Sequence, residues 1–214
     1  MLPIVTIDGP SGSGKGTIAK TISSQLGWNY LDSGLIYRVF AFTHLKNIDF
    51  LHEFQNFTFV LNENLEQVIF KEENISSQLR GPKLTKLASI LSKNLNVRKK
   101  LYKIQRSFLK KPGLVAEGRD MASVLFPESK IKIFLTAKLE TRVERRANQL
   151  RNTGQKVNIS ELRNEIILRD KSDSERENSP LEISEDSVVI QNDSESVEDA
   201  AVKIINLINE RYGK

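Results

Sequence analysis

Gly9-Pro-Ser-Gly-Ser-Gly-Lys-Gly-Thr17 is the stretch of this sequence that predicts the fold. Residues 2–8 before it form an apolar run typical of a buried strand. After it, apolar side chains recur at helical spacing up to Gly27, which can end a helix. Successive backbone N–H groups at a helix N-terminus bind anions, and glycine permits the positive φ angles that such a loop needs. The pattern therefore predicts a strand, a phosphate-binding loop and a helix.

All nine residues of this loop are predicted to bind the phosphates of a nucleoside triphosphate: Gly9, Pro10, Ser11, Gly12, Ser13, Gly14, Lys15, Gly16 and Thr17. The Lys15 ammonium group can reach the β- and γ-phosphates, and the Thr17 hydroxyl can bind Mg²⁺. ATP and Mg²⁺ are therefore the predicted cofactors. A glycine-rich turn without a ligand is the alternative, but the strand before the loop and the capped helix after it favour phosphate binding.

Further apolar runs at 113–116, 131–135 and 187–190 are typical of the buried strands of a parallel sheet. Each run leads into or follows a helical pattern. Ser196, with Asp199 three residues later, predicts the start of a last amphipathic helix. The alternation of strands and helices places the chain in the α/β class, with a parallel β-sheet P-loop core flanked by helices.

Two regions interrupt this alternation, and we expect substrate specificity to lie in them. The first is a β-rich insert at 55–80, where apolar residues on both sides of Asn62-Glu63-Asn64 predict an antiparallel hairpin. The leucines at 84, 87, 91 and 95 then predict one helix. The second is a charged segment at 138–176, which is predicted to contain a short helical lid at about 142–160 and a further helix from Ser160.

The bulk composition limits what the chain can be. Its 214 residues, 39% of them hydrophobic, suffice for a single domain spanning 1–214. The absence of cysteine excludes a disulfide framework and thiolate chemistry, and two histidines argue against a zinc enzyme. The glycine-rich loop leaves no room for a signal peptide, and no apolar run reaches membrane-spanning length. We expect a cytoplasmic monomer that does not bind membranes.

Charge is distributed unevenly along the chain, which has a net charge of +5. No acidic residue occurs between Glu73 and Glu117, whereas eleven lysines and arginines do, and no basic residue occurs between Arg176 and Lys203. A positive surface for an anionic ligand is therefore expected. RNA is one candidate for that ligand, but no series of aromatic residues accompanies the basic stretch, so we expect no nucleic-acid partner.

Gly16 departs from the general phosphate-loop pattern, in which Ser or Thr directly follows the lysine; here the hydroxyl comes one residue later, at Thr17. Gly-Lys-Gly-Thr is common in nucleoside monophosphate kinases. Three further stretches make the match closer, and with them the whole chain resembles bacterial cytidylate kinase. These stretches are Asp32-Ser-Gly-Leu-Ile-Tyr-Arg38, Gly118-Arg-Asp-Met121, and Arg169-Asp-Lys-Ser-Asp173 continuing to Arg176.

The resemblance implies phosphorylation of CMP, with dCMP as a second acceptor, and it assigns residues to the acceptor nucleotide. These are Ser33, Arg38, Ser89, Arg98, Arg119, Asp120, Arg169, Asp173 and Arg176. Guanidinium groups suit the bidentate binding of phosphate, and a carboxylate can accept a hydrogen bond from the exocyclic amine of cytosine. Lys15, Arg119, Arg169 and Arg176 are the expected catalytic residues. A surface charge or a helix cap is the alternative for any one of these residues taken alone.

The resemblance also implies two arginines over ATP and one acid near the metal. Arg142 and Arg146, one helical turn apart, match the lid that closes over ATP, with Arg145 as a weaker candidate; a solvated helix face is the alternative. Glu117 stands where an acid would orient a water bound to Mg²⁺. Ser172 occupies a position where the family often has arginine.

Other functions remain open from the sequence. UMP, another nucleotide or a small hydroxylated metabolite would change the acceptor and keep the fold. A metabolite hydroxyl would need a general base, and the arginines favour an anionic acceptor instead. A nucleotide-dependent switch is a third possibility, but the sequence contains no Asn-Lys-x-Asp guanine-binding motif.

Overall fold

The computed structural model describes residues 2–62, 65–152, 154–194 and 196–213, and it has a central sheet of five strands. The strands run in the order β2-β6-β1-β7-β8 and all neighbours pair in parallel, as expected for the α/β class. Their bounds are β1 Ile4–Asp8, β2 Asn29–Asp32, β6 Leu114–Gly118, β7 Ile131–Thr136 and β8 Val188–Gln191. The predicted runs correspond to β1, β6, β7 and β8; β2 was not predicted.

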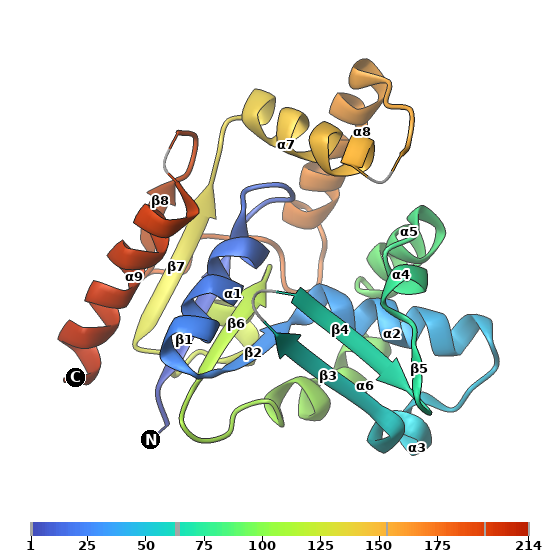
Figure 1. Cartoon of the computed structure of the whole chain (residues 1–214), viewed down its shortest axis with the longest axis horizontal. Helices are drawn as coiled ribbons and strands as arrows, with labels where there is room; N and C mark the ends of the chain where they lie inside the picture. The colour runs from blue at the N-terminus through green and yellow to red at the C-terminus, as the bar shows by residue number, and fades with distance from the viewer. Residues whose placement is uncertain (1, 63–64, 153, 195, 214) are drawn as a thin grey trace.

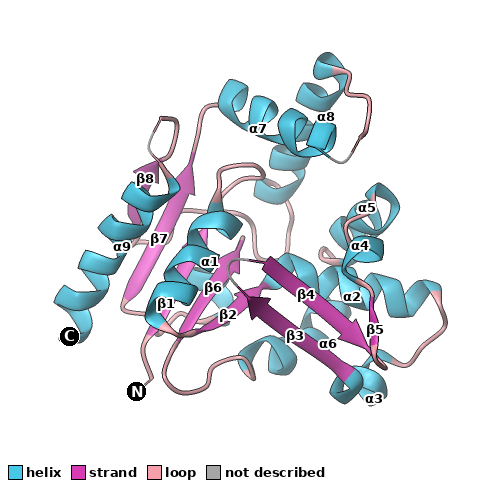
Figure 2. Cartoon of the chain, in the orientation of Figure 1, coloured by secondary structure: helices cyan, strands magenta, loops and turns pink. Residues whose placement is uncertain are grey.

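Helices cover both faces of this sheet (Figures 1 and 2). Successive strand residues point to opposite faces, so Ile4 and Val5 belong to two different hydrophobic cores. The core around Val5 contains α1 (Lys15–Leu26) and α9 (Val197–Tyr212). The core around Ile4 contains α2 (Ser33–Leu45) and α6 (Leu95–Arg106). The helix ends predicted at Gly27 and Ser196 are confirmed, because Gly27 is left-handed and the Ser196 hydroxyl accepts from the N–H of Asp199.

The insert carries a separate three-stranded antiparallel sheet, which lies beside the main sheet in Figure 1. The predicted hairpin is confirmed in its two strands, whereas positions 63 and 64 of its turn lie outside the described residues. Stacking of Phe57 on Phe70, with ring centroids 4.3 Å apart, joins the strands. The elements are α3 Phe50–Glu53, η1 Phe54–Asn56, β3 Phe57–Asn62, β4 Leu65–Phe70, β5 Glu73–Asn74, α4 Ser76–Leu79 and α5 Pro82–Leu91.

The prediction that one helix contains both Leu84 and Leu95 is wrong at the C-terminal end of that helix. Helix α5 ends at Leu91, and α6 begins at Leu95. The Asn94 side chain accepts from the N–H groups of Asn96 and Val97, so it caps a new helix instead of continuing the old one.

The charged segment folds into two helices, α7 (Leu139–Asn152) and α8 (Ile159–Ser174), which share a small core of their own. They stand above the carboxyl ends of β1 and β7 in Figure 1. Helix α8 begins one residue before the predicted Ser160, because Asn158 caps it. Across the described parts of the chain, no helix is long and apolar enough to cross a membrane.

Candidate active site

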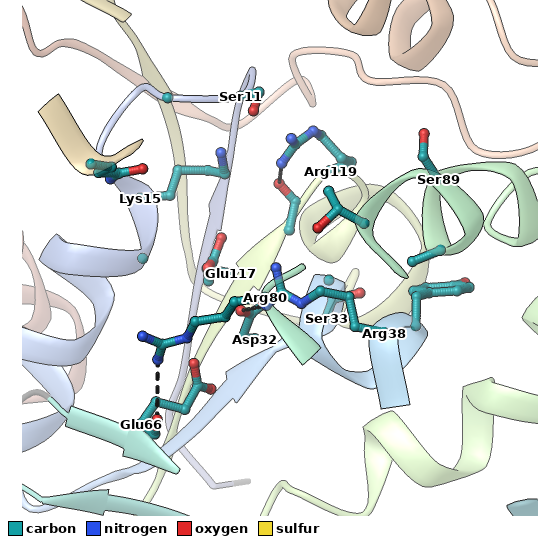
Figure 3. Close-up of a pocket in the computed structure, with 18 of the residues that line it drawn as sticks. Ser11, Lys15, Asp32, Ser33, Arg38, Glu66, Arg80, Ser89, Glu117 and Arg119 are labelled. Carbon is teal, nitrogen blue, oxygen red and sulfur yellow. Dashed lines mark hydrogen bonds and ion pairs between the residues drawn. The ribbon is translucent and has the colours of Figure 1, made fainter. Parts of the chain in front are cut away.

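A cavity of about 1160 Å³ lies between the glycine-rich loop, the insert and helices α7 and α8. It opens at the carboxyl ends of β1, β2 and β6, where ligands bind in parallel α/β sheets (Figure 3). Most of the predicted site residues line it: Ser11, Gly12, Gly14, Lys15, Gly16, Thr17, Ser33, Arg38, Ser89, Arg98, Glu117, Arg119, Asp120, Arg146, Arg169, Asp173 and Arg176. Gly9, Pro10, Ser13 and Arg142 are not among the lining residues.

The glycine-rich loop has the backbone geometry that its sequence predicts. Gly12 and Gly14 have φ angles of 78° and 98°, which L-residues with side chains rarely adopt. A Cβ atom on Gly9 would lie 2.0 Å from the carbonyl oxygen of Leu135, so only glycine fits there. The loop ends at Lys15, the first residue of α1, where free N–H groups favour an anion.

A cluster of cationic groups surrounds the mouth of this loop. Lys15 is buried, and its ammonium group donates to the carbonyl of Pro10 at 2.8 Å. Burial lowers the pKa of Lys15 to about 7, and the guanidinium groups of Arg119 and Arg169 add to this effect. Burial and the neighbouring Arg119 likewise lower the pKa of Arg169 to about 10. A phosphate among these groups would relieve their mutual repulsion, so the residues fit a polyphosphate ligand.

At the other end of the cavity, Asp120 is paired with two arginines. Its carboxylate accepts from Arg98, and its second oxygen lies 3.5 Å from Nη2 of Arg176. Asp120 and the Arg176 side chain are both almost fully buried, so the pairs are shielded from water. Ser89 lies on α5 at the wall of the cavity.

The remaining acceptor candidates are held by partners within the protein. Arg119 donates through Nε to Asp173 at 2.7 Å, and Arg38 donates to Asp32 at 2.8 Å. The hydroxyl of Ser33 donates to the side chain of Gln105 at 2.6 Å. These bonds fix the orientation of the side chains from α2, α8 and the turn after β6. The structure thus brings together residues that are spread over 140 positions of the sequence, from Ser33 to Arg176.

The two residues proposed for Mg²⁺, Thr17 and Glu117, both line the cavity. Thr17 is exposed in the first turn of α1, and Glu117 is buried at the end of β6, 3.4 Å from the Tyr30 hydroxyl. Burial and the nearby Asp32 carboxylate raise the pKa of Glu117. Within the described ranges, no group of three or more acidic or histidine side chains could hold a metal by itself. One hydroxyl and one carboxylate suit Mg²⁺, because proteins bind this ion through few ligands of their own together with substrate phosphates.

The lid arginines differ in their positions. Arg146 lines the cavity, as expected of a residue that binds ATP. Arg142 is buried and donates to the carbonyl of Ser11 and to Asp170, so it joins the lid to the back of the loop. Arg145 donates to the carbonyl of Ser13 at 3.3 Å. Contact of Arg142 with ATP stays a prediction, and in this conformation its guanidinium is engaged with protein.

Sequence reasoning missed an ion pair that joins the insert to the core. Glu66 on β4 lies 3.5 Å from Lys20 on α1, and Arg80 donates to the carbonyl of Glu66 at 3.2 Å. All three residues line the cavity. The strand pattern carried a signal, because Glu66 alternates with the buried Val68 and Phe70 and a carboxylate on that face is unusual.

Glu66 gives a testable dependence of stability on pH. Burial, followed by the charge of Asp32, raises the pKa of Glu66 from 4.5 to about 8, although Lys20 and Arg38 oppose the shift and Glu117 adds to it. The folded protein then binds the proton more tightly than the unfolded chain, so this contribution to stability is lost as pH rises from about 4.5 to 8. Glu66→Gln should remove the loss: relative to wild type, its free energy of unfolding should increase by about 1 kcal/mol or more between pH 5 and pH 8.

Urea denaturation at each pH measures this difference. Glu53→Gln, in the same insert, is the matched control, because hydrogen bonds from Lys71 and Asn56 lower the pKa of Glu53. The contribution of Glu53 to stability changes only below the ordinary pKa range of glutamate. The difference in free energy of unfolding between Glu53→Gln and wild type should therefore stay constant from pH 5 to pH 8. A constant difference between Glu66→Gln and wild type over the same pH range would contradict the raised pKa of Glu66.

Comparisons with known proteins identify the family of the chain. Residues 5–210 match the family described as cytidylate kinase. The chain is 38% identical to the cytidylate kinase of Shewanella baltica, with 98% of this chain and 96% of that protein covered. It is also 38% identical to the cytidylate kinase of Azotobacter vinelandii, with 97% and 96% covered. A solved structure of an uncharacterized protein from Eubacterium ventriosum has a TM-score of 0.56 at 15% identity, covers 98% of this chain and 99% of its own, and shows a likeness in fold alone. A family match over nearly the whole length, at this identity, means that the chain belongs to the cytidylate kinase family.

Proposed function

We propose that this protein transfers the γ-phosphoryl group of ATP to CMP, giving ADP and CDP, and that dCMP is a second acceptor. The observation that carries the proposal is a single cavity with a cationic phosphate loop at one end and Asp120, paired with Arg98 and Arg176, at the other. Such a cavity holds two anionic nucleotides with their phosphates toward each other.

On the donor side, the loop residues 9–17 would bind the ATP phosphates through backbone N–H groups. The Lys15 ammonium group would contact the β- and γ-phosphates and keep contact as the phosphoryl group moves. In this structure the group donates to the carbonyl of Pro10 and the hydroxyl of Ser13, at 2.8 and 3.5 Å. Closure of the lid would bring Arg146 over the donor, with Arg142 as a further candidate.

On the acceptor side, the arginines Arg38, Arg119, Arg169 and Arg176 would bind the phosphate of CMP. An oxygen of that phosphate attacks the γ-phosphorus while the bond to the bridging oxygen of ADP breaks. No general base is required, because the attacking oxygen is already anionic. Lys15, Arg119, Arg169 and Arg176 would stabilise the charge that spreads over the transferred group, and positioning supplies most of the remaining rate.

Mg²⁺ would be held by the Thr17 hydroxyl and, through a water, by Glu117; when bound it neutralises charge on the β- and γ-phosphates. Both residues line the cavity, which supports this assignment. The insert and the lid would exclude water and so prevent hydrolysis of ATP.

Base recognition would rest on Asp120, Ser89 and Arg98. The cytosine amine donates to a carboxylate, while its ring nitrogen and carbonyl accept from a hydroxyl or a guanidinium. Asp173 would accept from a ribose hydroxyl. Uracil presents a carbonyl in place of the amine and would meet the Asp120 carboxylate unfavourably, so UMP is not the favoured acceptor. We also propose that the protein is a cytoplasmic monomer; the lack of cysteine suits the cytoplasm.

A coupled assay of ADP release with CMP, dCMP, UMP and AMP as acceptors tests the proposal. We expect kcat/KM for CMP to exceed that for UMP and AMP by at least tenfold, since each well-placed pair with a base contributes about 1–3 kcal/mol. A higher value for UMP or AMP would contradict the assignment of the acceptor. ADP release without any acceptor would mean that the cavity does not exclude water.

A further inference from the structure

Asp8 is a buried carboxylate that the proposed function does not use. It is the last residue of β1, directly before Gly9, and only 3% of its surface is exposed. It is not among the residues that line the cavity. Its two carboxylate oxygens accept from the backbone N–H groups of Met121 and Ala122, at 2.9 and 2.8 Å.

The sheet explains why Asp8 reaches these groups. Strands β1 and β6 pair in parallel, and Asp8 lies opposite Gly118, the last residue of β6. The chain leaves β6 through Arg119 and Asp120 and enters a π-helical turn, η2, at Met121–Leu125. The first N–H groups of such a turn have no partner within it and must be satisfied from outside.

The residue expected to satisfy them is Asp120, which occupies the cap position of this turn. An aspartate there ordinarily accepts from the N–H groups that follow it. Asp120 makes no such bond with its side chain, and its carboxylate is instead paired with Arg98 and Arg176 at the cavity. The carboxylate of Asp8, from the neighbouring strand, takes its place.

We propose that Asp8 is a positioning residue for the acceptor nucleotide: it caps the turn after β6 and thereby leaves Asp120 and Arg119 to face the cavity. The inference rests on the proposed function, which assigns these two residues to the acceptor. Because Gly9 follows Asp8 directly, the same residue ties the start of the donor loop to the acceptor side of the site.

The pairing needs a carboxylate. Two oxygens accept from two N–H groups, whereas the amide of asparagine offers one oxygen and an NH₂ group that would face an N–H donor. A buried donor left without a partner destabilises the fold. Burial raises the pKa of Asp8 to about 7, with Asp120 adding to the shift and the two backbone N–H groups and Lys15 opposing it.

Steady-state kinetics of Asp8→Asn test the proposal, with ATP and CMP varied separately. We expect the KM for CMP to rise by about tenfold and the preference for CMP over UMP to fall, while the KM for ATP changes by less than about twofold. Thr6→Val is the matched control, because Thr6 is also buried on β1 and its hydroxyl donates to Ile131 instead. It should lower the unfolding temperature while leaving both KM values unchanged.

The outcomes separate this inference from the proposed function. Wild-type protein without CMP kinase activity would contradict the proposed function. An active wild type whose Asp8→Asn variant loses stability, with both KM values changed equally or not at all, would overturn the role of Asp8 alone.

If Asp8→Asn does not fold, a pH titration of the wild-type protein by NMR decides instead. The amide signals of Met121 and Ala122 should move together with a midpoint near pH 7, since both N–H groups bond to the titrating carboxylate. The groups nearest to Asp8, Lys15 and Asp120, are to be followed through their own signals in the same titration. Signals of the two amides that move independently of each other, or amides that exchange with solvent as fast as unprotected ones, would overturn the proposal.

Discussion

Lys15→Ala is expected to lower kcat for CMP phosphorylation by about a hundredfold or more, without unfolding the protein. The ammonium group is the cationic side chain at the phosphate loop itself, and its loss would leave the charge on the transferred group poorly stabilised. Lys15 bonds to Pro10 and Ser13 within the loop, and repulsion from Arg119 and Arg169 offsets its attraction to Glu117 and Asp8, so its removal should not unfold the protein. Steady-state kinetics and thermal unfolding measure the two effects.

Lys20→Ala is the matched control for this variant. Lys20 lies on the same helix and also lines the cavity, but its ammonium group faces Glu66. Its removal should lower kcat far less than that of Lys15, because loss of nearby charge acts more weakly than loss of direct contact. Near-normal kcat for Lys15→Ala, or equal losses for the two variants, would refute the assignment of the loop to the donor.

Asp120→Asn is expected to lower kcat/KM for CMP by about tenfold to a hundredfold and to bring the values for CMP and UMP close together. The amide can donate to the uracil carbonyl, whereas the carboxylate cannot. The variant also leaves the buried guanidinium groups of Arg98 and Arg176 without their anionic partner, so a loss of stability should accompany the loss of selectivity.

Asp170→Asn controls for the loss of a carboxylate paired with arginine. Asp170 pairs with Arg142 of helix α7 and is not among the residues that line the cavity. In Asp170→Asn, the ratio of kcat/KM for CMP to kcat/KM for UMP should equal that of wild type. An unchanged ratio in Asp120→Asn would remove Asp120 from base recognition, whatever happens to stability.

The donor half of the site was predictable from the sequence because it is local. Strand β1, the loop and α1 are consecutive, so hydrophobic period, glycine spacing and a C-cap residue identify them together. The hairpin of the insert follows from the same kind of local alternation. Strand β2 escaped prediction because four residues with mixed polarity give no clear period, and only pairing with β6 makes them a strand.

The acceptor half depends on contacts between distant positions. Its residues were named through the resemblance to a family, and no local pattern identifies them. Arg98 with Asp120 and Arg119 with Asp173 become pairs only when α6, β6 and α8 meet in the fold. Asp8 was hidden for the same reason, since a polar residue at the end of an apolar strand gives no hint of the turn that it caps.

The cationic cluster around Lys15, Arg119 and Arg169 acts beyond direct contact. The cavity lining carries nine lysines and arginines against five acidic residues, and a concave surface with an excess of positive charge gathers anionic nucleotides at its mouth before they bind. Salt confines this attraction to roughly 8 Å at physiological ionic strength, so it acts on nucleotides that are already close to the cavity. The same charges that repel one another in the free protein therefore also speed the encounter with both substrates.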